Sequence, residues 1–297
     1  MNFEEFDPEI GVDEYCHRIH SFLFPNSTSK NVDAAKLDLT YRIYPKGSVF
    51  SRVRPIREAE VNKYSSGLVT LKDFLPPTRS VTQIPIGRFN NQGERKLYLA
   101  DHPFVAIREC DIKPNTYFLI SCFSLKMDMR FIEVNSNGSA FCKLLNKLFQ
   151  SKDQRFYQVI NRVYERYLNY DCFQGIAYES VKVHTGYRDQ VWGEVKSTTN
   201  LAMTEGNISS AKLVTGWLAQ CGANHSIKLQ RIFKPLNPKK KNKLTSYLHQ
   251  ENKSKFISEH KQAMNDINNL TRKSELSIQK GKFINDAQYP IKFNLKD

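Results

Sequence analysis

The sequence predicts an α+β fold with a mixed, largely antiparallel sheet flanked by helices. First, segments with strand character and segments with helical character do not alternate regularly along the chain, as a doubly wound fold would require. Second, two amphipathic helical segments, 141–149 and 156–168, follow each other and precede a series of short strands. Third, 297 residues with 40% hydrophobic and 12% aromatic content are enough to bury a substantial core.

The first part of the chain reads as one helix followed by two strands. Residues 14–24 have apolar side chains at helical spacing. Residues 37–44 and 48–53 alternate and are rich in β-branched and aromatic side chains, which is typical of strands. Pro76 and Pro77 then interrupt regular structure.

The middle of the chain is predicted to hold a short strand, a helix and a buried strand. Residues 97–100 form the short strand. Pro103 suits the first turn of the following helix, and Asp101 is the expected N-cap. Residues 116–125 are almost continuously apolar and predict a buried strand.

The second half of the chain begins with the two amphipathic helices, each of which keeps its apolar side chains on one face. The last sixty residues are polar and predicted to be helical, with Gly281 as a late helix breaker. Between these parts the sequence predicts four strands, near 175–180, 199–203, 211–219 and 226–233.

The predicted organisation has three parts and no internal repeat. Residues 1–36 form an N-terminal helical segment, and residues 37–235 form a central α+β domain. Residues 236–297 form a basic, mainly helical C-terminal extension. No linker clearly divides the chain.

Several function classes receive no support from the sequence, and a cytoplasmic location is expected. The first fourteen residues are acidic and lack Lys and Arg, so they do not begin a secretory signal. The longest apolar run, 117–123, is too short to span a bilayer, so no membrane partner is expected. The six cysteines include no CxxC pair, which indicates reduced thiols rather than a disulfide framework.

The net charge of +14 is concentrated in residues 228–255, which hold nine Lys or Arg and one acidic residue, Glu251. Such a segment can bind the phosphates of nucleic acid or attract another anionic partner. It can equally be a solvated surface segment. No nucleic-acid-binding motif accompanies it, so charge alone does not indicate that class.

Metal and nucleotide motifs are also weak. His17 and His20 share a helical face beside Cys16, but nothing in the sequence completes a ligand set, and no metal is expected. The GxGxxG, Walker A and HExxH patterns are absent from the sequence.

The strongest local signal is GRFNNQGERKLYLADHPFVAIREC, residues 87–110. Gly87 and Gly93 bracket a turn that carries Arg88; Tyr98 lies on the following strand and Glu109 on the helix after it. A strand-to-helix connection of this kind can bring the three side chains around one cleft. The alternative is a buried Arg–Glu ion pair with Tyr98 in the core.

This segment resembles the core of the RES domain family, named for an arginine, a glutamate and a serine. The residues that match its turn, strand and helix are Arg88, Asn90, Gly93, Tyr98 and Glu109. Phe89 departs mildly, since many members have tryptophan or a small residue there.

Further matches extend the resemblance over about residues 40–205. Residues 48–56 are similar to an upstream arginine strand, with Arg52 and Arg54 as its arginines. Residues 175–182 are similar to the segment that carries the family serine, here Ser180, and Asn200 stands where the next strand often has asparagine.

The resemblance implies an ADP-ribosyltransferase-like fold and destruction of NAD+ by a toxin-like enzyme. Glu109 would stabilise the oxocarbenium ion that forms when nicotinamide leaves. Arg88, with Arg54 or Arg52, would clamp the pyrophosphate, because guanidinium groups bind phosphates bidentately. Tyr98 would offer a flat face to nicotinamide or ribose. Ser180 would orient the substrate rather than act as nucleophile, and Asn90 and Asn200 complete the set that would bind NAD+.

Three functions are left open by the sequence. The first is cleavage of NAD+ with transfer of ADP-ribose to water or phosphate, which makes NAD+ the substrate. The second is ADP-ribosylation of a protein or nucleic acid. The third is a non-enzymatic nucleic-acid-binding protein. The family also implies a neutralising antitoxin as partner, and a homodimer is compatible with the sequence.

Overall fold

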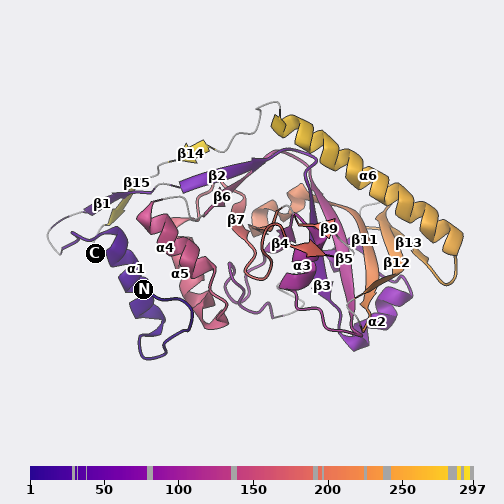
Figure 1. Ribbon diagram of the computed structural model, residues 1–297, viewed down its shortest axis with the longest axis horizontal. Coiled ribbons are helices and arrows are strands. Elements are labelled where there is room, and N and C mark those ends of the chain that lie inside the picture. The colour runs from indigo at the N-terminus through magenta and orange to yellow at the C-terminus, as the bar shows by residue number, and fades with distance from the viewer. Residues whose placement is uncertain are drawn as a thin grey trace.

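The chain folds as an α+β protein whose main feature is one large sheet, as Figure 1 shows. This computed structural model describes residues 1–297 except 29–30, 32, 38, 79–82, 135–138, 190–192, 196, 224–225, 237–241, 280–285, 289–290 and 295–297. Residues 237–241 of the predicted basic segment, and Gly281, therefore lie outside the described residues.

The large sheet contains ten strands, and β14 adds to one edge among the residues described. Strands β6 and β7 are parallel, and the other described neighbours run antiparallel. In spatial order the strands are β13 (Leu244–Leu248), β12 (Ile227–Pro235), β11 (Ala211–Cys221), β5 (Tyr117–Leu125), β3 (Val49–Pro55), β4 (Leu97–Ala100), β10 (Thr199–Met203), β7 (Gly175–Glu179), β6 (Met129–Glu133), β2 (Leu39–Tyr44) and β14 (Asp286–Gln288).

Among the described residues, two small two-stranded sheets lie outside the large one. One joins β1 (Asp33–Lys36) to β15 (Ile291–Asn294), and the other joins β8 (Arg188–Asp189) to β9 (Gly193–Glu194). The pairing of β1 with β15, and of β14 with β2, places the C-terminal strands against the N-terminal part of the chain (Figure 1).

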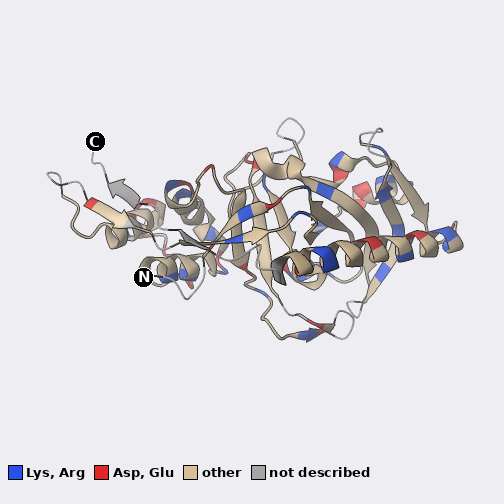
Figure 2. Cartoon of the chain, turned by 90° about the horizontal axis from the view of Figure 1, so that it is seen from above, with Lys and Arg blue, Asp and Glu red and all other residues tan. Residues whose placement is uncertain are grey.

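The helices cover the sheet at different places. They are α1 (Gly11–Leu23), α2 (Glu58–Ser65), α3 (Pro103–Glu109), α4 (Ala140–Phe149), α5 (Tyr157–Tyr167) and α6 (Lys253–Gln279), with short 3-10 segments η1 (Leu71–Phe74), η2 (Gln154–Phe156) and η3 (Glu205–Ser210). Helices α1, α4 and α5 gather at one end, and α6 runs along the end formed by β11, β12 and β13 (Figure 1). Figure 2, a cartoon coloured by residue type, shows basic and acidic residues distributed along α6.

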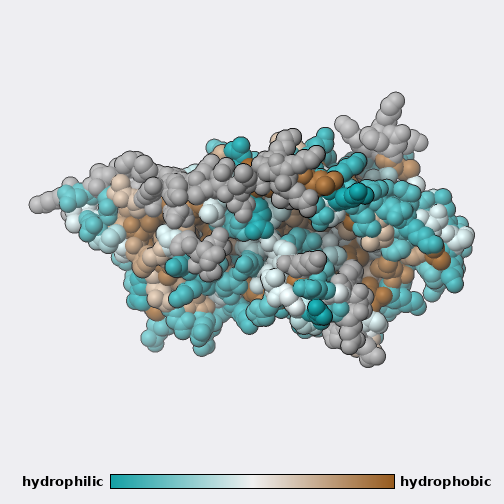
Figure 3. Space-filling model, turned by 45° about the horizontal axis from the view of Figure 1, so that its top comes forward, coloured by the Kyte–Doolittle hydropathy of each residue, from teal (hydrophilic) through white to brown (hydrophobic). Residues whose placement is uncertain are grey.

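The amphipathic sequences of α4 and α5 explain how these two helices pack on the rest of the protein. Ser139 accepts a hydrogen bond from the Cys142 amide and so caps α4. The apolar face of α4 places Leu145 and Leu148, and that of α5 places Val159 and Ile160, in one core together with side chains of α1. Figure 3 shows the outer surface of one face, which is mainly hydrophilic with separate hydrophobic patches.

Strand alternation separates two faces of the sheet. Leu97 and Leu99 of β4 point into the core beneath η1. Tyr98 and Ala100 point to the opposite face, where Tyr98 packs against the core of α1, α4 and α5 and Ala100 joins the core beneath α3 and α6. The candidate site lies where these last two cores meet.

Most predicted elements are confirmed, and Pro103 does begin α3. The expected cap is wrong: His102 is the N-cap and accepts from the Phe104 amide, while Asp101 accepts a hydrogen bond from Ser197. Strand β13, within the predicted extension 236–297, pairs with β12 and so belongs to the large sheet. In the part of the chain that the structure describes, none of the helices combines the length and the apolar content of a bilayer span.

Candidate functional site

The turn that carries Arg88 is held by a dense set of hydrogen bonds. The Gly87 amide donates to the Asn90 carbonyl (3.0 Å). The Tyr98 hydroxyl donates to Asn90 Oδ1 (2.8 Å) and accepts from the Phe89 amide (3.0 Å). A Cβ on Gly87 would lie 2.3 Å from Asn90 Oδ1, so only glycine fits this position. The Gly, Asn and Tyr of the motif therefore form one rigid turn.

A residue that the sequence did not single out secures this turn from behind. Asn161, on the buried face of α5, donates through Nδ2 to the Gly87 carbonyl (2.9 Å) and the Asn90 carbonyl (3.1 Å). Its side chain is buried, and a buried amide needs such partners. The sequence could have indicated this residue only as an asparagine that lies beside the apolar face of the helical segment 156–168.

Arg88 points from this turn to the end of α4. Its Nη1 donates to the carbonyls of Phe149 and Ser151, the latter at 3.0 Å, and its guanidinium lies 5.3 Å from the centre of the Tyr157 ring. A cation at a helix C-terminus is favourable because the last carbonyls lack helical partners. No hydrogen bond from the described residues engages Nε or Nη2 of Arg88.

Glu109 ends α3 and is bound by two side chains from distant strands. Oε1 accepts from Ser180 Oγ (2.6 Å) and from Asn200 Nδ2 (3.1 Å), across sequence separations of 71 and 91 residues. Within the described residues, no hydrogen bond reaches Oε2. Three predicted site residues thus meet at one carboxylate.

The hydrogen-bonding capacity of Ser180 is fully used. Its hydroxyl donates to Glu109, and its oxygen accepts from the amides of Lys182 and Val183, each at 3.1 Å. A hydroxyl offers one donor and two acceptor positions. Lys182 also donates through Nζ to the Glu109 carbonyl (3.0 Å) and to Asp111 (2.6 Å), which ties the end of α3 to the segment after β7.

Tyr178 packs against the turn through Phe89, and no role was predicted for it from the sequence. It is the register partner of Asn200, and its ring centre lies 4.8 Å from that of Phe89. Burial raises the pKa of Tyr178 well above its ordinary value; nearby Tyr98 and Glu109 add to this rise, and Arg88 opposes it. Arg88 and Glu109 therefore both lie near Tyr178, although no salt bridge joins them within the described part of the chain.

A hollow of about 340 Å³ is lined in part by Ser180, the residue that donates to Glu109, whereas Glu109 and Arg88 do not line it. Its lining also includes Gln150 and Lys152, from the segment after α4, and His184 and Thr198. This volume is at the lower end of the range of small-molecule sites. The mixed polar lining suits a hydrophilic ligand.

Arg52 and Arg54 are not brought to this cluster. Arg52 Nη1 donates to the Phe74 carbonyl (3.1 Å), and Arg54 donates to the Tyr64 hydroxyl (2.7 Å) and pairs with Glu60 (2.8 Å). On β3 they alternate with Ser51 and Val53, so they point to the face covered by η1. Glu109 lies on the other face of the sheet, so the structure does not bring these two arginines to the carboxylate beside which they were predicted to clamp the pyrophosphate.

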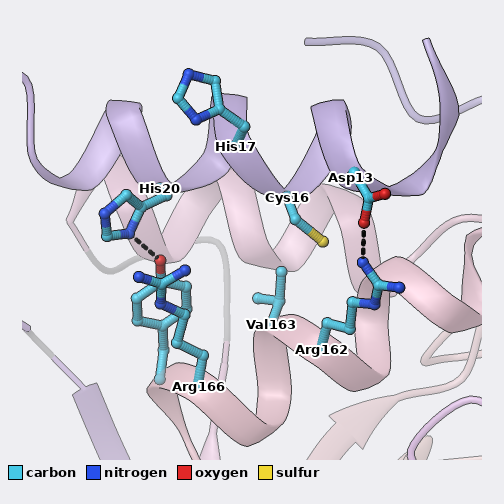
Figure 4. A pocket seen from close by; sticks show the side chains of 8 residues that line it. Asp13, Cys16, His17, His20, Arg162, Val163 and Arg166 are labelled. Carbon is cyan, nitrogen blue, oxygen red and sulfur yellow. Dashed lines mark hydrogen bonds and ion pairs between the residues drawn. The ribbon is translucent and has the colours of Figure 1, made fainter. Parts of the chain in front are cut away.

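Figure 4 shows His17 and His20, the two histidines that share a helical face in the sequence. They line a crevice of about 300 Å³ between α1 and α5. His20 Nδ1 lies 2.6 Å from the Tyr167 hydroxyl, His17 points away from α5, and Cys16 points toward it. No group of three His, Cys, Asp or Glu in the described parts of the chain has the arrangement of a metal site.

Comparison with known proteins found no matching protein-family model, no matching curated protein and no matching solved structure. The resemblance to the RES domain family thus rests on the residues quoted above.

Proposed function

We propose that the protein cleaves the nicotinamide–ribose bond of NAD+, with Glu109 as the central catalytic residue. The observation that carries this proposal is the fixed carboxylate: Ser180 and Asn200 hold Oε1, while Oε2 accepts no hydrogen bond from a described residue. Preorganised charge of this kind stabilises a transition state without further rearrangement. In this proposal, part of the substrate lies in the hollow beside Ser180.

The reaction suits a single carboxylate. When the C1′–N bond of NAD+ breaks, its electron pair moves to the pyridinium nitrogen, and neutral nicotinamide leaves without a general acid. The ribose becomes an oxocarbenium ion, which the Glu109 carboxylate stabilises electrostatically. Water or phosphate then bonds to C1′, and a water nucleophile loses its proton to the solvent. Ordinary glycosidases instead need two carboxylates.

Ser180 acts as a positioning residue in this account. Its donor and both acceptor positions are occupied, so its hydroxyl is not free to attack C1′. Asn200 supports the same carboxylate oxygen from β10. Together they fix the direction of Oε2.

Arg88 and Tyr98 have different roles in this proposal: Arg88 binds the substrate, and Tyr98 holds the turn that carries Arg88. Nη1 of Arg88 is occupied by the carbonyls of Phe149 and Ser151, which leaves Nε and Nη2 for a phosphate group of NAD+. The Tyr98 hydroxyl is engaged by Phe89 and Asn90, so it holds the turn rather than the substrate. Asn90 has the same supporting role.

Incubation of the purified protein with NAD+, with and without phosphate, tests the proposal. We expect release of nicotinamide together with ADP-ribose in water, or with ADP-ribose 1″-phosphate if phosphate is the acceptor. Labelled ADP-ribose that becomes attached to a macromolecule would indicate transfer instead. No release of nicotinamide by the folded protein under any of these conditions would refute the proposal.

A further inference from the structure

A groove of about 1020 Å³ opens where β11 and β12 part near α6. Their pairing begins only at Gly216 and Phe233, although β11 starts at Ala211. Beyond Phe233, β12 continues to Pro235 as a partner of β13. The α6 segment 266–273 lines the same groove. Helix α6 runs over this end of the sheet (Figure 1).

The interior of the groove is aliphatic. Leu71, Leu75, Leu213, Leu244 and Leu270 come from η1, the residue after it, two strands and α6. Leu236, beside them, is 36% exposed. No aromatic side chain lines the groove among the residues that the structure describes.

Lysines surround this interior from five parts of the chain. They are Lys126, Lys212, Lys234, Lys243 and Lys273, against one acidic residue, Asp266. Two are engaged: Lys234 pairs with Glu259 (2.9 Å), and Lys126 donates to the Ser209 carbonyl (2.5 Å). The other three are exposed and form no ion pair with a described residue.

We propose that this groove binds an acidic segment of a partner protein, whose apolar side chains contact the leucines and whose carboxylates meet Lys212, Lys243 and Lys273. Charge complementarity selects an anionic partner and accelerates its association. Apolar side chains on a short acidic segment match an aliphatic groove with a polar rim.

The arrangement distinguishes this partner from other anions. Single-stranded nucleic acids bind through aromatic side chains that stack on bases, and the groove is aliphatic. A lipid with one anionic head group would need cations at one end, whereas these lysines lie on β11, before β13 and on α6. An acidic protein segment carries several separated charges and fits this distribution.

Fluorescence anisotropy with the full-length protein tests the proposal. The probes are labelled peptides of about fifteen residues that combine leucine with glutamate, one with leucines at helical spacing and one with alternating leucines. Matched peptides carry glutamine in place of glutamate, and single-stranded RNA and DNA of similar length serve as competing probes. We expect a glutamate peptide to bind at least about 10-fold more tightly than its glutamine counterpart, with affinity that falls as salt rises.

Two variants locate the binding. The triple change Lys212→Glu, Lys243→Glu and Lys273→Glu should weaken peptide binding at least about 10-fold. The matched change of exposed Lys113, Lys143 and Lys147 to glutamate should leave it unchanged, although it alters net charge equally. Leu236→Ala should weaken binding without any change of charge.

The proposal would be overturned by three results. One is absence of binding by either glutamate peptide up to about millimolar concentration. Another is equal weakening by both lysine variants, which would indicate a general charge effect. The third is tighter binding of an oligonucleotide through the same three lysines, which would assign the groove to nucleic acid.

Discussion

Replacement of Tyr98 by phenylalanine tests the rigid turn most directly. The hydroxyl satisfies two buried groups, the Phe89 amide and Asn90 Oδ1, and Phe89 and Asn90 are 0% and 4% exposed. Each buried polar group left without a partner costs about 1–3 kcal/mol, so Tyr98→Phe, which leaves two, should lower the free energy of unfolding by about 2–6 kcal/mol. Because phenylalanine keeps the ring, no large cavity forms, and the measured loss of stability comes from the missing hydroxyl.

Urea unfolding followed by circular dichroism measures this change, and Tyr187→Phe is the matched control. The Tyr187 side chain is 49% exposed and stacks on Phe104 through its ring, which phenylalanine keeps. The control should therefore change stability by less than about 0.5 kcal/mol. A loss as small as this in Tyr98→Phe would refute the claim that the hydroxyl holds the turn.

Three further predictions concern glycine, a buried acid and alkaline pH. Gly87→Ala should cost about 1–3 kcal/mol by displacing Asn90, whereas Gly206→Ala, whose Cβ would meet nothing within 4 Å, should be nearly neutral in the same unfolding experiment. Burial raises the pKa of Asp101 from 3.8 to about 6, so the folded state favours the neutral acid and loses stability as pH rises through this range. Asp101→Asn should therefore stabilise the protein by up to about 3 kcal/mol at pH 7 and by almost nothing near pH 3.8; equal effects at both pH values would contradict this. Burial raises the pKa of Tyr44, Tyr167 and Tyr170 from 10 to about 12, so the melting temperature should fall between pH 10 and pH 12, and a constant value would be inconsistent with these shifts.

Local periodicity predicted much of the fold. The bounds of β4 match the predicted strand 97–100, and α4 and α5 lie within a residue or two of their apolar stripes. Helix α2 was missed because its polar sequence buries only Tyr64 fully. Strand β13 was missed because it lies in the basic segment and depends on pairing with β12, which local patterns do not reveal.

The candidate site was predicted in part. The motif named Glu109, Ser180 and Asn200, and the fold joins them through contacts that span 71 and 91 residues. Spacing could not show that Arg52 and Arg54 point to the opposite face, since this depends on which face of β3 meets η1. Asn161 and Tyr178 were missed because each looks like an ordinary member of a helix or strand until the turn packs against it.

The rate at which Glu109→Gln releases nicotinamide from NAD+ tests the central claim. Glutamine keeps the shape and an oxygen that accepts from Ser180 and Asn200, so the melting temperature should stay close to that of the parent. Loss of the charge should slow cleavage about 100- to 1000-fold. Glu58→Gln removes an exposed carboxylate of α2 and should leave the rate unchanged. Cleavage at the parent rate by folded Glu109→Gln would contradict the proposed role of this carboxylate.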